Sequence, residues 1–222
     1  MNNKTFLEEK EKLKEINNKV LEEEKLIEEE LRKSDMNYTM EDIAKGEVLL
    51  TRVKKLENIK KIKNVPYFAR MDFKEENRDL EKLYIGKISI LDNKTAEPII
   101  VDWRAPISNL YYEGKIGSAE YECLGKKIKG DILLKRQYII EKKQLKKYID
   151  INVTGNDELL QNALEEKADD RLKNIVATIQ DEQNKIIRAK INSPLIVQGV
   201  AGSGKTTIAL HRIAYLIYNY EK

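Results

Sequence analysis

A glycine-rich loop near the C-terminal end of the sequence constrains the fold more than any other feature. It reads GVAGSGKT and satisfies the pattern G-x-x-x-x-G-K-[ST] with Gly199, Gly204, Lys205 and Thr206. The apolar run 195–197 before it predicts a short strand, and the apolar spacing after Thr206 predicts a helix. In a strand, loop and helix of this order, backbone N–H groups and the positive helix end surround a phosphate. We therefore expect the start of a P-loop α/β domain that binds a nucleoside triphosphate.

The motif gives a role to each polar group of the loop. Lys205 would reach the β and γ phosphates of ATP as the catalytic lysine, and the Thr206 hydroxyl would bind Mg²⁺. The alternative is a glycine turn before a core helix, which the flanking strand and helix patterns disfavour. The predicted nucleotide-binding residues of the loop are Gly199, Val200, Ala201, Gly202, Ser203, Gly204, Lys205, Thr206 and Thr207.

Composition is typical of a globular protein with long, solvated helices. Of the 222 residues, 41% are hydrophobic and 36% are charged, and the formal net charge of +3 does not by itself indicate nucleic-acid binding. The single cysteine, Cys123, excludes an internal disulfide, and one histidine, His211, is too few for a Cys/His metal site. Neither a membrane span of ~20 apolar residues nor a signal peptide is present, so we expect a cytoplasmic protein without a membrane partner.

Residues 1–63 are expected to form an antiparallel helical hairpin, a coiled-coil arm. In a segment rich in Glu and Lys, apolar residues recur every seven positions: Phe6, Leu13, Val20 and Ile27. A break at 34–37 separates this helix from a second helical pattern, which Pro66 stops. The length and the narrow apolar stripe favour an arm over a plain surface helix.

Residues 64–150 predict a mainly antiparallel β-module. Runs of β-branched and aromatic residues alternate with turn residues at spacings too short for crossover helices. The expected strands are 84–91, 98–102, 120–124 and 131–141. Asp102 ends a strand as the magnesium-supporting acid of P-loop ATPases does, but it comes before the phosphate loop rather than after it. We therefore assign Asp102 a structural role, either capping a turn or pairing with Arg104.

Residues 151–222 turn helical again before the phosphate loop. A capped amphipathic helix is expected at 156–164, and a second helix with apolar positions from Ile175 to Ile187 should end near Lys190. The expected fold class is therefore α+β, with the start of a truncated α/β domain at the C-terminal end.

The last segments resemble the start of a superfamily 1 helicase of the UvrD/Rep type. The resemblance rests on 181–188, 195–206 and 209–218. In that family a glutamine upstream of the Walker A lysine reads the adenine edge, and the resemblance implies this role for Gln183, whose amide can both donate and accept. It also implies that 151–222 is the first part of a RecA-like ATPase domain. Thr207 stands where many members have an arginine, so that arginine's phosphate contact does not carry over.

The upstream module is similar to that of HelD, a family of helicase-like ATPases that bind RNA polymerase and release it from stalled complexes. The matching segments are 66–73, 84–86, 101–107 with its DWRAP motif, 110–112 and 134–137. Over residues 1–63 the likeness is one of type only, a helical hairpin before the β-module. In the family the hairpin enters the secondary channel of the polymerase with an acidic tip. Here the acids near the tip are Asp35, Glu41 and Asp42.

The resemblance implies an ATP-dependent motor that binds RNA polymerase through the helical arm and promotes its recycling. One alternative is a helicase or translocase on single-stranded DNA, and nucleic acid is an expected partner of the parent protein in either case. Another alternative is a non-catalytic interaction module with an incomplete nucleotide site. ATP hydrolysis in this fold needs an acid and arginines from later strands and a second RecA domain. We therefore expect residues 1–222 to be the N-terminal fragment of an ATPase, inactive in hydrolysis by itself.

Overall fold

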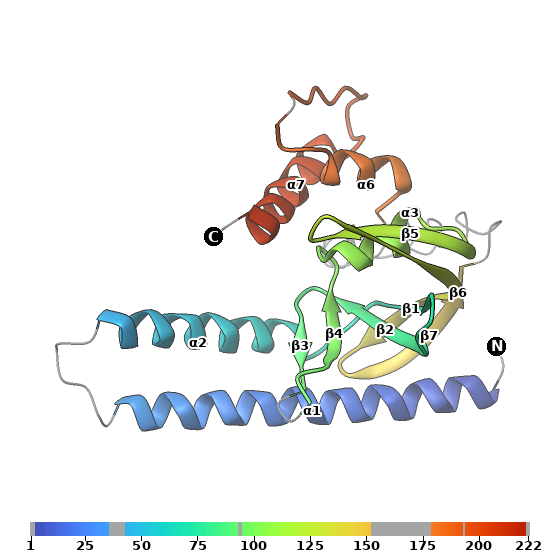
Figure 1. Ribbon diagram of the computed structural model, residues 1–222. Helices are drawn as coiled ribbons and strands as arrows, with labels where there is room; N and C mark the ends of the chain where they lie inside the picture. The colour runs from blue at the N-terminus through green and yellow to red at the C-terminus, as the bar shows by residue number, and fades with distance from the viewer. Residues whose placement is uncertain (1–2, 36–42, 93–94, 152–178, 193, 221–222) are drawn as a thin grey trace. The chain divides into compact units, whose positions relative to one another are not determined.

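The chain combines long helices with an extended β-sheet. The computed structural model describes residues 3–35, 43–92, 95–151, 179–192 and 194–220 (Figure 1). Helices lie at the N-terminal and C-terminal ends of this part of the chain, and the strands lie between them. The mixed α and β class predicted from the sequence is confirmed. The truncated P-loop domain stays a prediction.

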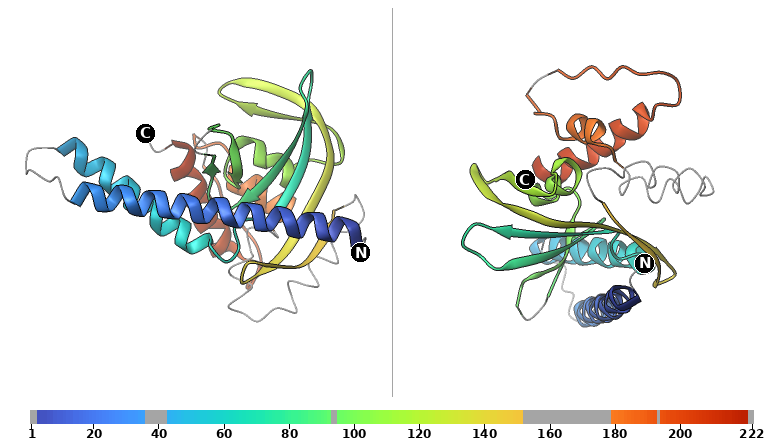
Figure 2. Two further views of the ribbon diagram at one scale, coloured as in Figure 1. Left: turned by 90° about the horizontal axis from the view of Figure 1, so that it is seen from below. Right: turned by 90° about the vertical axis from the view of Figure 1, so that its right-hand side faces the viewer.

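Two helices form the predicted N-terminal hairpin: α1, Asn3–Asp35, and α2, Ile43–Ile62. Helix α1 contains neither glycine nor proline, and its many Glu, Lys and Leu residues favour a helix. The two helices run side by side in opposite directions (Figures 1 and 2). Ion pairs join the two sides of the hairpin: Glu23–Lys55, Glu24–Lys63, Glu28–Lys60 and Glu30–Arg52. The coiled-coil assignment stays a prediction, and the tip residues 36–42 lie outside the described residues.

A seven-stranded sheet follows the hairpin, in the order β3-β4-β2-β1-β6-β5, with β7 paired to β6. The strands are β1 Ala69–Glu75, β2 Leu80–Gly86, β3 Ile90–Leu91, β4 Pro98–Asp102, β5 Gly117–Cys123, β6 Lys126–Glu141 and β7 Gln144–Asp150. The pairs β3–β4 and β5–β6 are antiparallel, as the sequence predicted. In the β5–β6 hairpin the register runs from Gly117 opposite Ile132 to Cys123 opposite Lys126.

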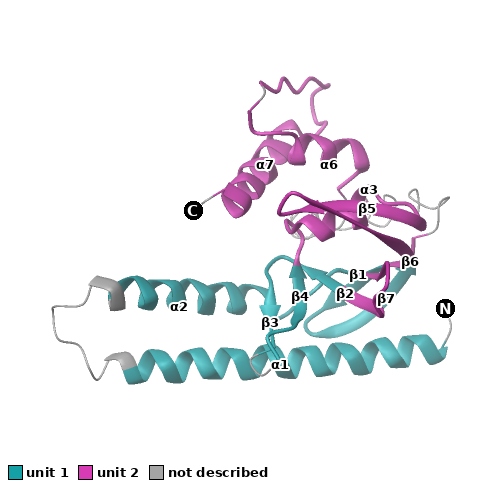
Figure 3. Cartoon of the chain, in the orientation of Figure 1, with its two compact units in different colours: residues 1–69, 84–101, 136–149 teal, residues 70–83, 102–135, 150–222 magenta. Residues whose placement is uncertain are grey.

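The chain divides into two compact units. Unit 1 comprises residues 1–69, 84–101 and 136–149, and unit 2 comprises residues 70–83, 102–135 and 150–222 (Figure 3). Several strands contribute residues to both units. The domain division at residues 63 and 150 stays a prediction.

The core of unit 1 joins the helical hairpin to the strand segments of that unit. The apolar residues that recur at every seventh position of α1 all contribute to this core: Leu13, Val20 and Ile27 are buried, and Phe6 packs against the cluster. Two further apolar side chains of α1, Leu7 and Leu21, stay exposed because each lies one position, about 100° of helix, beyond the buried stripe. Ile16 of α1 and Ile59 and Ile62 of α2 also belong to the cluster. The strands of the unit and Tyr67, just before β1, supply its remaining members: Tyr67, Tyr84, Ile90, Ile100, Tyr138, Ile140, Leu145 and Tyr148.

Unit 2 contains the helical segments that carry the predicted site. A 3₁₀ turn, η1 Pro106–Ser108, and the short helix α3 Asn109–Glu113 follow strand β4. Helix α6, Asp181–Arg188, and helix α7, Lys205–Tyr220, pack against each other. The predicted helix after Thr206 is therefore present. The predicted helix at 156–164 lies outside the described residues.

Two sequence expectations in this region are wrong. The run 195–197 is not a strand: no described strand pairs with it, and its Ile196 side chain is 92% exposed. A strand needs a paired neighbour to satisfy its backbone groups, and apolar character alone does not supply one. The second helix begins at Asp181, so that Ile179 precedes it, because Gln180 adopts an extended conformation and caps the helix.

Candidate nucleotide-binding site

The phosphate loop has the backbone conformation that its glycines predict. Gly202 and Gly204 adopt φ angles of +81° and +79°, a region in which a side chain is strained. The N–H of Ser203 donates to the carbonyl of Val200 at 3.2 Å, which closes a turn inside the loop. A Cβ atom on Gly199 would lie 2.7 Å from the Ser203 hydroxyl oxygen, so a larger residue there would require the Ser203 side chain to move. The glycine-rich sequence of the loop thus determines its backbone conformation.

Lys205 lies at the first position of α7, directly after the loop. Its Nζ donates to the carbonyl oxygens of Gly199 and Val200, each at 2.8 Å. The ammonium group is therefore held over the loop at the positive end of a 16-residue helix. Positive charge, a helix N-terminus and left-handed glycines together fit a bound phosphate chain.

The remaining loop residues are accessible. Val200, Ala201, Gly202, Ser203 and Thr206 are exposed, and Thr207 is half-buried, whereas Ile208, one position further on, is buried. Within the described residues, no group of three or more His, Cys, Asp or Glu residues could hold a metal ion. A magnesium ion at this loop would therefore depend on the hydroxyl of Thr206 and on the phosphates of the nucleotide itself.

Gln183 lies in the first turn of α6, where it forms a capping box with Gln180. Its side-chain oxygen accepts a hydrogen bond from the Gln180 N–H at 3.2 Å. Within the described residues no hydrogen bond joins Gln183 to the phosphate loop, so the structure does not bring these predicted site residues into direct contact. The amide oxygen accepts within the cap, so the amide nitrogen of Gln183 is the atom from which it would donate to a ligand.

Helix α6 is fixed through Asn184, the residue next to Gln183. The Asn184 side chain is fully buried, and its Nδ2 donates to Asn109 at 2.7 Å and to Glu113 at 2.9 Å, both on α3. Its Oδ1 accepts from Arg188 Nε at 3.0 Å, one turn further along α6. This network fixes the rotation of α6, and with it the direction in which Gln183 leaves the helix.

Arg212 connects α7 to the end of α6. Its Nη1 donates to the carbonyl oxygens of Ile186, Ile187 and Ala189 at distances between 2.8 and 3.1 Å. These carbonyls belong to the last turn of α6 and to its C-cap residue, Ala189, where a helix leaves its acceptors unsatisfied and carries partial negative charge. One side chain of the helix that begins at the phosphate loop therefore caps the helix that carries Gln183.

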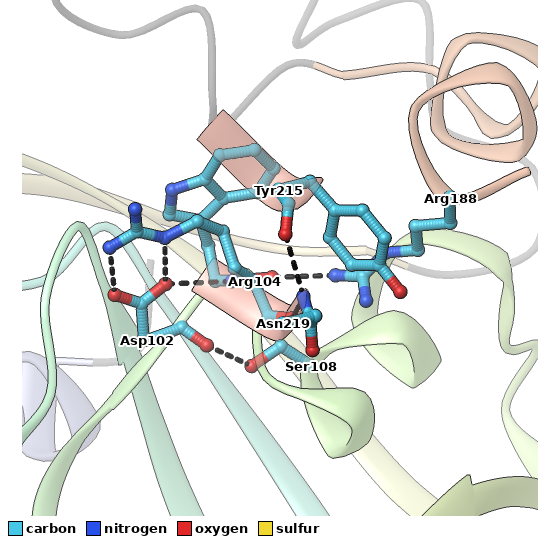
Figure 4. A network of polar contacts seen from close by, with 7 residues as sticks. Asp102, Arg104, Ser108, Arg188, Tyr215 and Asn219 are labelled. Carbon is cyan, nitrogen blue, oxygen red and sulfur yellow. Dashed lines mark hydrogen bonds and ion pairs between the residues drawn. The ribbon is translucent and has the colours of Figure 1, made fainter. Parts of the chain in front are cut away.

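The DWRAP segment lies against both helices in unit 2. Asp102 accepts hydrogen bonds from the backbone N–H, the Nε and the Nη2 of Arg104 at 2.6 to 2.8 Å, which confirms the structural role assigned to it (Figure 4). Ser108 donates to the Asp102 carbonyl at 2.7 Å. The guanidinium of Arg188 reaches the carbonyl of Trp103 at 2.6 Å, and Asn219 of α7 reaches that of Arg104 at 3.5 Å.

Sequence reasoning did not assign functional weight to Asn184, Arg188, Arg212 or Asn219. Arg188 and Arg212 lie in segments whose likeness to helicases was evident, but their bonds span 83 to 85 and 23 to 26 residues respectively. Arg212 lies in the middle of α7, and Arg188 at the end of α6 donates to carbonyls of another segment. No local sequence signal identifies acceptors that lie so far along the chain.

Two family models match consecutive parts of this chain. Residues 6–170 match the family model described as DNA helicase IV HelD, N-terminal domain. The chain belongs to the HelD family. Residues 179–221 of this HelD-type chain match the UvrD/REP helicase N-terminal domain, which covers α6, the phosphate loop and α7. The resemblance seen in the sequence is thereby confirmed.

A search of curated proteins found no match to this chain. No helix among the described residues is long and apolar enough to cross a membrane. The roles of the individual loop residues and of Gln183 stay predictions.

Proposed function

We propose that this chain binds Mg²⁺ and ATP at the phosphate loop. The observation that carries the proposal is the position of Lys205, at the start of α7 with its ammonium group over the carbonyls of Gly199 and Val200. Those two carbonyls are weak partners for a full positive charge, and a phosphate chain would replace them with anionic oxygens. The family match over residues 179–221 supports the same site.

Each residue would have a separate task in the bound state. Lys205 would hold the β and γ phosphates, and loop N–H groups of residues 200–206 would orient them. Thr206 would contribute its hydroxyl to the magnesium ion, which neutralises phosphate charge when bound. Gln183 would donate its amide nitrogen to the adenine edge.

Isothermal titration with Mg·ATP tests the proposal directly. We expect saturable binding by the wild-type chain and its loss in Lys205→Ala, because this variant lacks the ammonium group that contacts the loop carbonyls. Lys185→Ala is the matched control, since Lys185 lies on α6 with its side chain 62% exposed and forms a surface ion pair with Asp181. Equal binding by the wild type and Lys205→Ala would reject the site.

For the parent protein we propose an ATP-dependent motor that binds RNA polymerase and promotes its release. The α1–α2 hairpin supports this proposal, because it offers a long charged surface with exposed apolar residues on α2, among them Leu50 at 62% and Val53 at 38% exposed. We propose these exposed side chains as part of the surface that contacts the protein partner.

Co-purification with core RNA polymerase tests this proposal. We expect Leu50→Asp and Val53→Asp to reduce the retained polymerase, while Leu80→Asp, at 44% exposure on β2, leaves it unchanged. Equal retention by all variants would remove the hairpin from the interface, and no retention by the wild type would reject the partner.

A DNA helicase or translocase is the second candidate, and the description of the matching family as a DNA helicase favours it. Single-stranded DNA would then stimulate ATP hydrolysis by the parent protein, and strand separation would accompany it. RNA polymerase would have no effect on that activity. A non-catalytic interaction module would instead bind Mg·ATP without any stimulation by either partner.

A further inference from the structure

The DWRAP segment contacts both helices that flank the phosphate loop, although it precedes α6 by about 75 residues and α7 by about a hundred. On α6, Arg188 donates to the carbonyl oxygens of Trp103 at 2.6 Å and Ala105 at 3.4 Å. On α7, the Tyr218 ring receives the guanidinium of Arg104 at 4.6 Å from its centroid. The segment therefore fixes α6 and α7 relative to each other.

A short chain of contacts leads from this segment to the phosphate loop. The Trp103 ring meets the His211 ring edge to face, with 5.6 Å between centroids. His211 Nδ1 donates to the carbonyl of Thr207 at 2.7 Å, and Thr207 is the second residue after Lys205. The Trp103 side chain is buried, so a shift of the first turn of α7 would change the environment of its indole ring.

Arg188 occupies the centre of the arrangement. Besides its bonds to the segment, its guanidinium lies over the rings of Tyr112 at 5.8 Å and Tyr215 at 5.1 Å. Its Nε donates to Asn184, the residue beside Gln183. One guanidinium thus contacts the segment, α3, α6 and α7, and burial lowers its pKa. A planar group that donates in several directions suits this position better than a lysine would.

We propose that residues 102–105 are a positioning element of the nucleotide site, coupled to its occupancy through Arg188, Trp103 and His211. The proposal rests on Mg·ATP binding at the phosphate loop. Coupling is reciprocal: nucleotide that stiffens the start of α7 changes the surroundings of Trp103, and loosening the segment weakens nucleotide binding. Trp103 and Arg188 are positioning residues, because they touch the loop only through other side chains.

A purely structural role would give a different result. Packing alone predicts that changes in the segment lower the melting temperature while the folded protein binds Mg·ATP as before. Positioning predicts a change in the dissociation constant and in the response of Trp103. The two are separable because Trp103 is the only tryptophan of the chain, so its emission reports on this segment alone.

The experiment titrates the full 222-residue chain with Mg·ATP while Trp103 emission and heat are recorded in parallel. We expect the emission to change saturably with the same midpoint as the heat. Tyr218→Leu removes the ring beneath Arg104 and should weaken binding about two- to fivefold, the range of a cation–π contact. Tyr220→Leu is the matched control, because Tyr220 lies on the same helix at 53% exposure, and it should bind as the wild type does.

Arg188→Met and Arg188→Lys form a second pair. Methionine should weaken binding and reduce the emission change, and lysine should restore part of both, because it can still donate to one carbonyl. If Arg188→Met fails to fold, the tyrosine pair still decides. Mg·ATP binding that leaves Trp103 emission unchanged, or that is equal in Tyr218→Leu and wild type, overturns the coupling alone. Absence of any binding heat with the wild type overturns the nucleotide site, and the coupling with it.

Discussion

Glu9 and Arg136, separated by 127 residues in the sequence, form a buried ion pair with 2.7 Å between Oε1 and Nη1. Glu9 lies on α1 and Arg136 on β6, both in unit 1. The hydroxyl of Tyr138 donates to the second Glu9 oxygen at 2.7 Å, and the Tyr148 ring lies 4.3 Å from the Arg136 guanidinium carbon. The first turns of the N-terminal helix are therefore anchored to a strand far along the chain by a satisfied polar network.

Removal of one partner should destabilise the protein strongly. Glu9→Ala leaves the Arg136 charge buried without its carboxylate, and the free energy of unfolding should fall by about 3–5 kcal/mol. Urea denaturation followed by circular dichroism measures the loss. Glu8→Ala is the matched control, because Glu8 is exposed on the same helix and its replacement should change little. A similar loss in both variants would mean that helix propensity, and not the ion pair, sets the stability.

Lys135 predicts a pH dependence of stability. Its Nζ donates to the Gly114 carbonyl at 2.8 Å near the Tyr111 ring, and burial lowers its pKa from 10.5 to about 8, against a smaller upward effect of Asp181. Because the folded pKa is the lower one, the unfolded chain binds more protons between about pH 8 and 10.5. The contribution of Lys135 to stability therefore rises with pH through this window, by about 1.4 kcal/mol for each unit of pKa difference.

Comparison of the wild type with Lys135→Met isolates this contribution from other groups that titrate at alkaline pH. The wild type should gain stability relative to the variant between pH 8 and 10.5. Lys129→Met, which changes an exposed lysine of the same strand, should show no such trend. A flat difference for both variants would contradict the lowered pKa.

The sequence predicted those parts of the fold whose pattern is local. The strand 98–102 and the helix after Thr206 are found where periodicity and composition placed them. Strand β1 was not predicted, because its inward positions include a salt-bridged Arg70 and Asp72, which are polar in the sequence but buried together in the structure. Strand β7 was not predicted for a related reason: two lysines separate its buried residues Leu145 and Tyr148 and break the alternation of apolar and polar residues.

In the candidate site too, the features with a local sequence pattern were predictable and the long-range contacts were not. The glycines and Lys205 follow a contiguous pattern whose backbone geometry is dictated by sterics, so the conformation of the loop was predictable, while the roles of its residues stay predictions. The supports of the site are long-range, as in the bonds from Arg188 to Trp103 and from Asn184 to Asn109. No periodicity relates such pairs, and only the folded chain brings them together.

Arg212 should contribute to stability through its cap on α6. Arg212→Met removes a charged donor from the carbonyls of Ile186, Ile187 and Ala189, and we expect a loss of about 1.5–3 kcal/mol in the free energy of unfolding. Arg78→Met serves as control, since the Arg78 side chain is 65% exposed. Denaturant titration of both variants measures the difference. An effect of Arg212→Met no larger than that of the control would show that water replaces the cap without cost.

Gly204 provides a test of the loop geometry that leaves its charge unchanged. An alanine at the φ of +79° is strained by about 1–2 kcal/mol, and relief of that strain would turn the loop N–H groups away from a phosphate. We expect Gly204→Ala to weaken Mg·ATP binding about tenfold in isothermal titration, since 1.4 kcal/mol corresponds to a factor of ten.

Gly46→Ala is the matched substitution for this test. Gly46 lies within α2 with open space around it, so alanine there should raise the free energy of unfolding by about 0.5–1 kcal/mol and leave nucleotide binding unchanged. Weaker Mg·ATP binding by Gly204→Ala together with unchanged binding by Gly46→Ala would show that the backbone conformation of the loop sets nucleotide affinity. If Gly204→Ala bound Mg·ATP as tightly as the wild type, the left-handed residue would be dispensable and the loop would have to hold phosphate by Lys205 alone.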